Sequence, residues 1–128
     1  MKTVKVPTLK KPSRVQLPDK LIKGSFCDKD DCQCLVGFLI NKAGISKSIL
    51  RNSEPKSDDG ITYTLCENKN SKQKMTTLSI MRKVYGWNST RVANTIIKND
   101  CCSSSKERIT LLKSELDKLG IKYYKAKS

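Results

Sequence analysis

The sequence of 128 residues contains no histidine, and aromatic residues make up only 5% of it. Without an imidazole there is no Ser-His-Asp triad, no Cys-His nucleophile pair and no histidine ligand for a metal ion. We also find no glycine-rich phosphate loop and no paired carboxylate motif in the sequence. These absences exclude the commonest catalytic sites, and we expect the protein not to be an enzyme.

Long hydrophobic runs are missing as well. The longest apolar run, Leu35–Ile40, is far shorter than the roughly 20 residues that span a bilayer. The basic N-terminal segment has no apolar stretch of the kind found in signal peptides. We therefore expect a cytoplasmic protein without a membrane partner, in which the six cysteines are thiols or metal ligands. A secreted protein with disulfides is the alternative.

Acidic residues are outnumbered by basic ones. Lysine and arginine together number 26 against 12 aspartates and glutamates, which gives a formal net charge of +14. The excess is spread along the chain, apart from two local acidic segments at residues 27–34 and 57–67. Such a balance suits a polyanionic partner: nucleic acid, a nucleotide, or an acidic protein or nucleoprotein surface. A solvated, lysine-rich surface without a partner is the alternative interpretation.

The most basic segments are residues 2–23 and the loop 69–74. Lysine-rich segments of this kind bind phosphate backbones without reading sequence. They have no interleaved aromatic residues, because Tyr123 and Tyr124 lie at the other end of the chain, so base stacking is not indicated. The candidate anion-binding residues are Lys2, Lys5, Lys10, Lys11, Arg14, Lys69, Lys72, Lys74, Arg82, Lys83 and Arg91.

Residues 1–20 contain Pro7, Pro12 and Pro18 and show no helical period, which predicts an extended basic N-terminal arm. We expect residues 21–128 to form a single compact domain, since domains of about 100–150 residues are the commonest. The fold class that we predict is mostly α with a small two-stranded β element (α+β).

Apolar residues recur at helical spacing in five segments beyond the arm. A capping residue precedes each segment, and a glycine follows three of them in the position of a left-handed C-cap. The predicted helices run from Asp30 or Asp31 to Gly44, from Ser46 over Ile49 and Leu50, from Thr76 or Thr77 to Gly86, from Asn88 over Ala93 and Ile97, and from a capping box of Ser104 and Glu107 to Gly120.

Two short segments are predicted to be strands. Residues 61–66 alternate between apolar and polar side chains, and residues 121–124 form a second candidate that would pair with them. Polar composition predicts loops at residues 52–60 and 68–74.

Residues 78–97 have the layout of a DNA-binding helix-turn-helix unit, with two short helices about a turn that contains glycine. In that interpretation, the start of the second helix would contact bases or phosphates through Asn88, Ser89, Thr90, Arg91 and Asn94. Arg82, however, stands where such units carry a small buried residue, and the second helix has little positive charge. We favour an ordinary helical hairpin that packs Trp87 into the core.

The cysteines raise the question of zinc. A structural zinc site without histidine needs four thiolates, and the candidate set is Cys27, Cys32, Cys34 and Cys66. The spacing from Cys27 to Cys32 is slightly long for a zinc hook, and that from Cys32 to Cys34 is short. Cys34 also falls on the apolar face of the first helix, where it behaves as a small hydrophobic residue. We favour free thiols and no cofactor, with a small zinc-stabilised interaction module as the alternative.

Several short motifs occur in this order along the chain: Lys23-Gly24, Cys34-Leu35-Val36-Gly37, Tyr85-Gly86-Trp87, Asn99-Asp100 and a Glu-Arg leucine helix that ends in Leu119-Gly120-Ile121. With these motifs, residues 22–124 resemble a loose group of small bacterial and phage proteins of no established function. The resemblance implies that the Cys-x-x-Gly helix belongs to the core. It also implies an accessory protein of a phage with an AT-rich genome, of the kind that acts against host machinery, including nucleic-acid-based immunity.

These observations predict a non-enzymatic binding protein whose basic surface engages nucleic acid, a nucleotide signal or a host nucleoprotein complex. Its role would be that of a phage-type counter-defence or host-takeover factor, acting in the host cytoplasm. The alternatives are a helix-turn-helix DNA-binding regulator and the zinc-stabilised interaction module.

Overall fold

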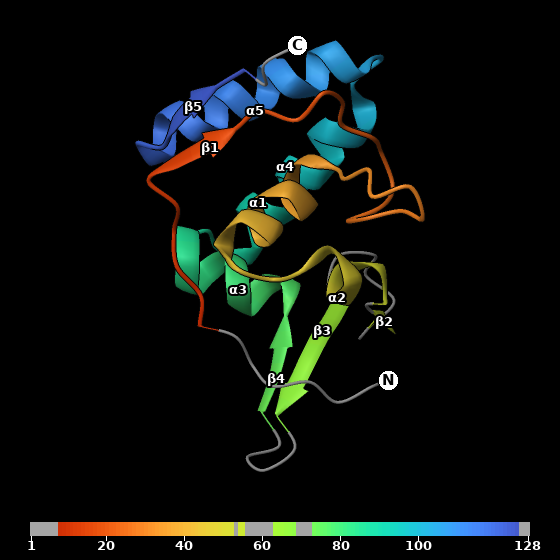
Figure 1. Ribbon diagram of the computed structural model, residues 1–128, viewed down its shortest axis with the longest axis vertical. Helices are drawn as coiled ribbons and strands as arrows, with labels where there is room; N and C mark the ends of the chain where they lie inside the picture. Colours follow the sequence, from red (N-terminus) through yellow and green to blue (C-terminus); the bar gives the residue numbers. More distant parts are fainter. Residues whose placement is uncertain (1–7, 53, 56–62, 69–72, 126–128) are drawn as a thin grey trace.

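The structure, a computed structural model, describes residues 8–52, 54–55, 63–68 and 73–125, and only the backbone of residues 54, 55, 65–68, 73 and 74. Helices dominate it, so the mostly α fold class with a small amount of β structure is confirmed (Figure 1). The chain runs through β1 (Arg14–Gln16), α1 (Leu35–Ala43), α2 (Lys47–Arg51), β2 (Glu54–Pro55), β3 (Tyr63–Asn68), β4 (Gln73–Thr76), α3 (Thr77–Tyr85), α4 (Ser89–Cys101), α5 (Ser105–Leu119) and β5 (Lys122–Tyr124).

Helix α1 is the centre of the core. It is apolar around almost its whole circumference, and a helix of that composition is stable only when neighbours cover every side. Helices α3, α4 and α5 all pack against it, and Figure 1 shows it between α5 above and α3 below. The buried residues of α1 are Leu35, Val36, Gly37, Phe38, Leu39, Ile40 and Ala43.

The predicted start of this helix at Asp30 or Asp31 is wrong. The carboxylate of Asp28 accepts the backbone N–H groups of Asp30 and Cys32, both at 2.9 Å, and so closes a tight turn. Asp31 takes a left-handed backbone conformation there, with φ 63°, which a helix cannot continue. The aspartates therefore form a turn of their own, and the helix begins only after Cys34.

Cys34 and Gly37 fix how the preceding chain crosses α1. The Cys34 thiol serves as the N-cap and accepts the backbone N–H of Gly37 at 3.4 Å. The backbone of Phe26 passes directly over Gly37, where a Cβ atom would lie 2.1 Å from the Phe26 carbonyl oxygen. The Cys-x-x-Gly helix thus belongs to the core, and its glycine is required for this close approach.

Residues 14–16 of the N-terminal segment form strand β1, and alternate side chains from residue 15 on pack into the helical domain. Val15 and Leu17 are buried members of the main core cluster. Strand β1 pairs in parallel with β5, with Arg14 opposite Lys122 and Gln16 opposite Tyr124. The expectation that residues 121–124 pair with residues 61–66 is therefore wrong, because β5 has β1 as its neighbour.

The other sheet has the antiparallel order β2–β3–β4. Its strand β3 confirms the predicted strand for residues 63–66, while residues 61 and 62 lie outside the described residues. The predicted loop at 68–74 is corrected at both ends, since Asn68 belongs to β3 and Lys74 to β4. Backbone pairing between the two strands extends this hairpin further than its polar side chains indicate.

Most helix ends lie where the sequence predicts them. The side chains of Ser46, Thr76, Asn88 and Ser104 each accept a backbone N–H from the first turn of the following helix. Glycines 44, 86 and 120 end α1, α3 and α5 in the predicted positions. At the predicted capping box of α5, the Glu107 carboxylate accepts hydrogen bonds from the backbone N–H and the hydroxyl of Ser103, and not from the backbone of Ser104. These hydrogen bonds from Ser103 lower the pKa of Glu107.

A buried polar network joins four parts of the chain. Arg108 of α5, only 9% exposed, donates to the backbone carbonyls of Asn99 at 3.0 Å, Leu21 at 3.2 Å and Cys102 at 3.0 Å. The Asn99 side chain accepts the N–H of Leu35 at 3.2 Å and donates to the carbonyl of Ile22 at 3.0 Å. The positive charge of Arg108 faces the C-terminal end of α4, where the helix dipole is negative.

We expect Gly37→Ala to destabilise the protein by about 3 kcal/mol, because the added Cβ would overlap the Phe26 backbone. The matched control is Gly86→Ala, at a glycine with φ +73° and open space around the Cβ position. This control carries only the left-handed conformational penalty of about 1 kcal/mol. Urea unfolding monitored by circular dichroism measures both variants. Equal losses would contradict the tight crossing of Phe26 over α1.

We expect Arg108→Met to cost at least about 3 kcal/mol, because it removes the three hydrogen bonds that the guanidinium donates to backbone carbonyls at a largely buried site. The control Arg82→Met removes an exposed arginine from α3 and should change the free energy of unfolding by less than about 0.5 kcal/mol. Urea denaturation of both variants gives the comparison. A small effect at Arg108 would mean that water replaces the guanidinium there.

Candidate functional site

The candidate anion-binding residues divide into three groups in the structure. Lys2, Lys5, Lys69 and Lys72 lie outside the described residues, and Lys74 is described only as a backbone position in β4. Arg91 is half-buried. The exposed candidates are Lys10, Lys11, Arg14, Arg82 and Lys83.

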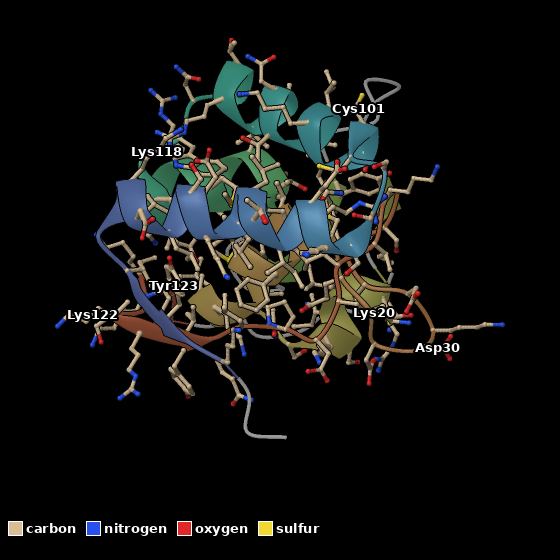
Figure 2. The ribbon with its side chains drawn as sticks, turned by 90° about the horizontal axis from the view of Figure 1, so that it is seen from above. Lys20, Asp30, Cys101, Lys118, Lys122 and Tyr123 are labelled. Atoms are coloured by element: carbon tan, nitrogen blue, oxygen red, sulfur yellow. The ribbon has the colours of Figure 1, made fainter. Side chains whose placement is uncertain are left out.

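The pairing of β1 with β5 gathers basic residues from both ends of the chain. Arg14 lies directly opposite Lys122 in the register of the two strands. Lys11 donates from Nζ to the carbonyl of Leu119 at 3.3 Å, at the C-terminal end of α5. Figure 2 shows Lys122 at the edge of the molecule beside the two strands. We call this surface the terminal basic patch and define it as Lys11, Arg14, Lys122, Tyr124 and Lys125.

The patch also contains an aromatic residue. The Arg14 guanidinium carbon lies 4.3 Å from the centroid of the Tyr124 ring. Tyr124 is 41% exposed, and the tyrosine that is distant in sequence from the basic arm therefore lies beside it in space. Sequence reasoning missed this arrangement. The signal available was the spacing of Val15 and Leu17, which are buried on one side of an extended segment interrupted by prolines.

Among the described residues, no carboxylate forms an ion pair with Lys11, Arg14 or Lys122; the recorded ion pairs are Arg51 with Asp31 and Glu115 with Arg91 and Lys118.

Two carboxylates lie at the border of the patch. Asp19 shares a hollow of about 230 Å³ with Lys113 and Lys125. Burial raises the pKa of Tyr123, and the nearby charge of Asp117 and a hydrogen bond to it raise that pKa further.

The predicted helix-turn-helix unit places its residues elsewhere. Arg91 stacks on Trp87, 4.4 Å from the ring centroid, and pairs with the buried carboxylate of Glu115 at 3.0 Å. Glu115 also pairs with Lys118 at 3.5 Å, on the side of α5 opposite Lys122 (Figure 2). Trp87 is 1% exposed, so the expectation that it packs into the core is confirmed.

A shallow polar groove lies beside this ion pair, between α4 and α5. It has a volume of about 540 Å³ and is lined by Asn88, Thr90, Arg91, Asn94, Thr95, Lys98, Glu115 and Lys118. Polar side chains of the predicted recognition helix line this groove. The Arg91 side chain, however, is engaged by Glu115 of α5 and by the Trp87 ring.

The candidate zinc ligands have different environments. Cys34 is buried, and burial raises the pKa of its thiol to about 11; burial also raises the pKa of Cys27. In both cases burial favours the neutral thiol over the thiolate. Within the described ranges, no group of three or more cysteine, aspartate or glutamate side chains is placed to hold a metal ion. The Cys66 side chain lies outside the described residues, so the four-cysteine set stays a hypothesis.

Comparison with models of protein families, with curated proteins and with solved structures finds no significant match. The resemblance to small bacterial and phage proteins therefore stays an interpretation of short motifs. In the part of the chain that the structure describes, no helix is both long and apolar enough to cross a membrane.

We expect alkylation by iodoacetamide at pH 8 to modify the exposed Cys101 much faster than Cys34 in the native protein. In urea the two rates should become similar. Folding raises the Cys34 pKa from about 9 to about 11. The resulting contribution to the free energy of unfolding is therefore fully present below pH 9 and is lost as the pH rises toward 11. Site-resolved mass spectrometry measures the rates, and native labelling of Cys34 at the Cys101 rate would contradict its N-cap position.

Proposed function

We propose that the protein binds nucleic acid through the terminal basic patch and acts by binding rather than by catalysis. The observation that carries this proposal is the parallel pairing of β1 with β5. It places cations from both ends of the chain next to one another and beside an exposed tyrosine. Such a surface matches the two chemical features of nucleic acid, its phosphate charge and its aromatic bases.

The phosphate backbone is the first feature. Cations that contact phosphates release condensed counterions, so that affinity falls steeply with salt. Arg14 and Lys122 are exposed, and neither forms an ion pair with a carboxylate of the described residues. A guanidinium binds phosphate through two parallel hydrogen bonds, whereas lysine acts as a point charge.

The patch has neighbours that would lengthen the basic surface. The backbone N–H of Lys10 donates to Ala43 at 3.0 Å, at the end of α1. The Tyr85 hydroxyl of α3 donates to Leu39, one turn earlier on the same helix, at 2.5 Å. Arg82 lies in the last turn of α3, with Lys83 beside it, and both are exposed. The N-terminal arm and the end of α3 thus meet the same half of α1.

The more specific roles, such as a phage-type counter-defence factor, are supported by fewer observations than nucleic-acid binding. A phage-type counter-defence factor that acts on a host nucleoprotein complex in the cytoplasm is compatible with this surface, but it rests on the resemblance alone. The nucleotide signal, the helix-turn-helix regulator and the zinc-stabilised module remain alternatives. The groove between α4 and α5 supports the regulator only through its exposed Asn88, Thr90 and Asn94.

We expect the wild-type protein to bind a fluorescein-labelled oligonucleotide with an affinity that falls steeply between about 50 and 200 mM salt. The double variant Arg14→Gln/Lys122→Gln should bind more weakly and reduce the slope of log K against log salt by about 2, or about 1 for each cation removed. Fluorescence anisotropy titrations measure both quantities. The reason is that each of these residues neutralises phosphate charge.

The matched control is Lys29→Gln/Lys106→Gln, which removes the same charge at a distance. Lys106 lies in the first turn of α5, about 20 Å along the helix from Leu119. The control should keep the wild-type slope. An affinity that is flat with salt would overturn the proposal. Preference for one duplex sequence, lost on Thr90→Ala/Asn94→Ala, would instead favour the helix-turn-helix regulator.

A further inference from the structure

We infer that the terminal basic patch selects single-stranded nucleic acid, with one base stacking on the Arg14–Tyr124 pair. This inference rests on the proposed function, because it names the class of nucleic acid that the same site takes. The lysines of the patch attract any polyanion, whereas an exposed aromatic ring distinguishes a base from a phosphate.

Tyr124 is the most exposed aromatic side chain of the described residues. Phe26 and Tyr63 contact each other edge to face, with ring centroids 5.0 Å apart. Tyr85 and Trp87 are buried in the core. Tyr124 is 41% exposed, a value exceeded among the large hydrophobic side chains of the described residues only by the aliphatic Ile97.

The register of the strands places the relevant groups on one face. Side chains alternate along a strand, so residues 14 and 16 of β1 point to the same side. The burial of β1 follows this alternation, with Val15 turned into the core between exposed Arg14 and Gln16. Their register partners, Lys122 and Tyr124, are the exposed residues of β5. The outer face of this strand pair therefore presents a guanidinium, an amide, an ammonium group and a phenol ring.

The contact between Arg14 and Tyr124 prepares a stacking surface. A guanidinium is planar and weakly hydrated, and both guanidinium groups and aromatic rings stack on nucleobases. At 4.3 Å from the ring centroid, Arg14 restricts the orientations of both side chains before any ligand binds. Lys122 and Lys125, on either side of Tyr124 in sequence, would contact the phosphates that flank the stacked base.

This geometry favours single strands for a simple reason. In a duplex, the faces of the bases are covered by their stacked neighbours, and proteins reach only the base edges in the grooves. In a single strand, each base can turn outward and place its face on an aromatic ring.

The experiment compares three ligands that differ in their bases. They are an oligothymidylate of about 15 nucleotides, an abasic oligomer of the same length and charge, and a duplex of the same length. Fluorescence anisotropy at fixed salt gives the dissociation constants. We expect the wild-type protein to bind the oligothymidylate at least about fivefold more tightly than the abasic oligomer, because stacking a base on an aromatic ring contributes roughly this much or more.

Three variants assign that difference to the stack. Tyr124→Leu and Arg14→Lys should both lose most of the preference for oligothymidylate while they retain binding to the abasic oligomer. Tyr124→Phe keeps the ring and should retain the preference. Ile97→Ala removes the other exposed hydrophobic side chain and serves as the matched control, with no change expected. Circular dichroism melting of each variant shows whether it is folded.

The outcomes separate the inference from the proposed function. Equal binding of oligothymidylate and abasic oligomer by the wild-type protein, with steep salt dependence, overturns the stacking inference and leaves nucleic-acid binding intact. Tighter binding of the duplex than of the single strand also overturns it. A loss of affinity for both single-stranded ligands in folded Tyr124→Leu assigns the ring a structural role and overturns it as well. Absence of salt-dependent binding to all three ligands overturns the proposed function itself.

Discussion

The buried guanidinium of Arg108 is the interaction on which the arrangement of the chain depends. A buried cation needs its hydrogen bonds satisfied, and here three backbone carbonyls supply the acceptors, two at the C-terminal end of α4 and one at Leu21. Asn99 adds bonds to the first turn of α1 and to Ile22. Residues 21 and 22 are thereby tied to the ends of α4 and α5. Because this segment follows β1 directly, the network also holds β1 near α5 and the strand after it.

Local signals account for most of what the sequence predicts correctly. Helix caps depend on hydrogen bonds between residues a few positions apart, so they can be predicted from the local sequence. This holds for the N-caps Ser46, Thr76 and Asn88 and for the glycines that end α1, α3 and α5. The start of α1 is the exception. Asp30 and Asp31 are good N-cap residues by type, but both lie in the turn that the Asp28 carboxylate closes, and Asp31 has a left-handed backbone there. A local turn within the same segment thus prevails over the N-cap signal of these aspartates.

The candidate site was only partly predictable for a different reason. Lys10, Lys11 and Arg14 are recognisable as basic residues in a proline-containing segment, but their neighbours are set by contacts such as that between Lys11 and Leu119, 108 positions apart. Parallel strands have no tight turn between them that would announce the pairing. Arg91 shows the converse. Its charge and position suit phosphate binding, yet it pairs across from α4 to the buried carboxylate of Glu115 in α5, and nothing near it in sequence indicates that partner.

The strand pair of β1 and β5 encloses nearly the whole described chain between its two members. A contact of such long range is among the last to form, because the helices between the strands must assemble before the ends can meet. The same separation makes it a natural place for the fold to open first. A polymer that touches both strands at once would act as a clasp across this seam. Occupancy of the surface and closure of the fold at its ends would then rise and fall together, as one linked equilibrium.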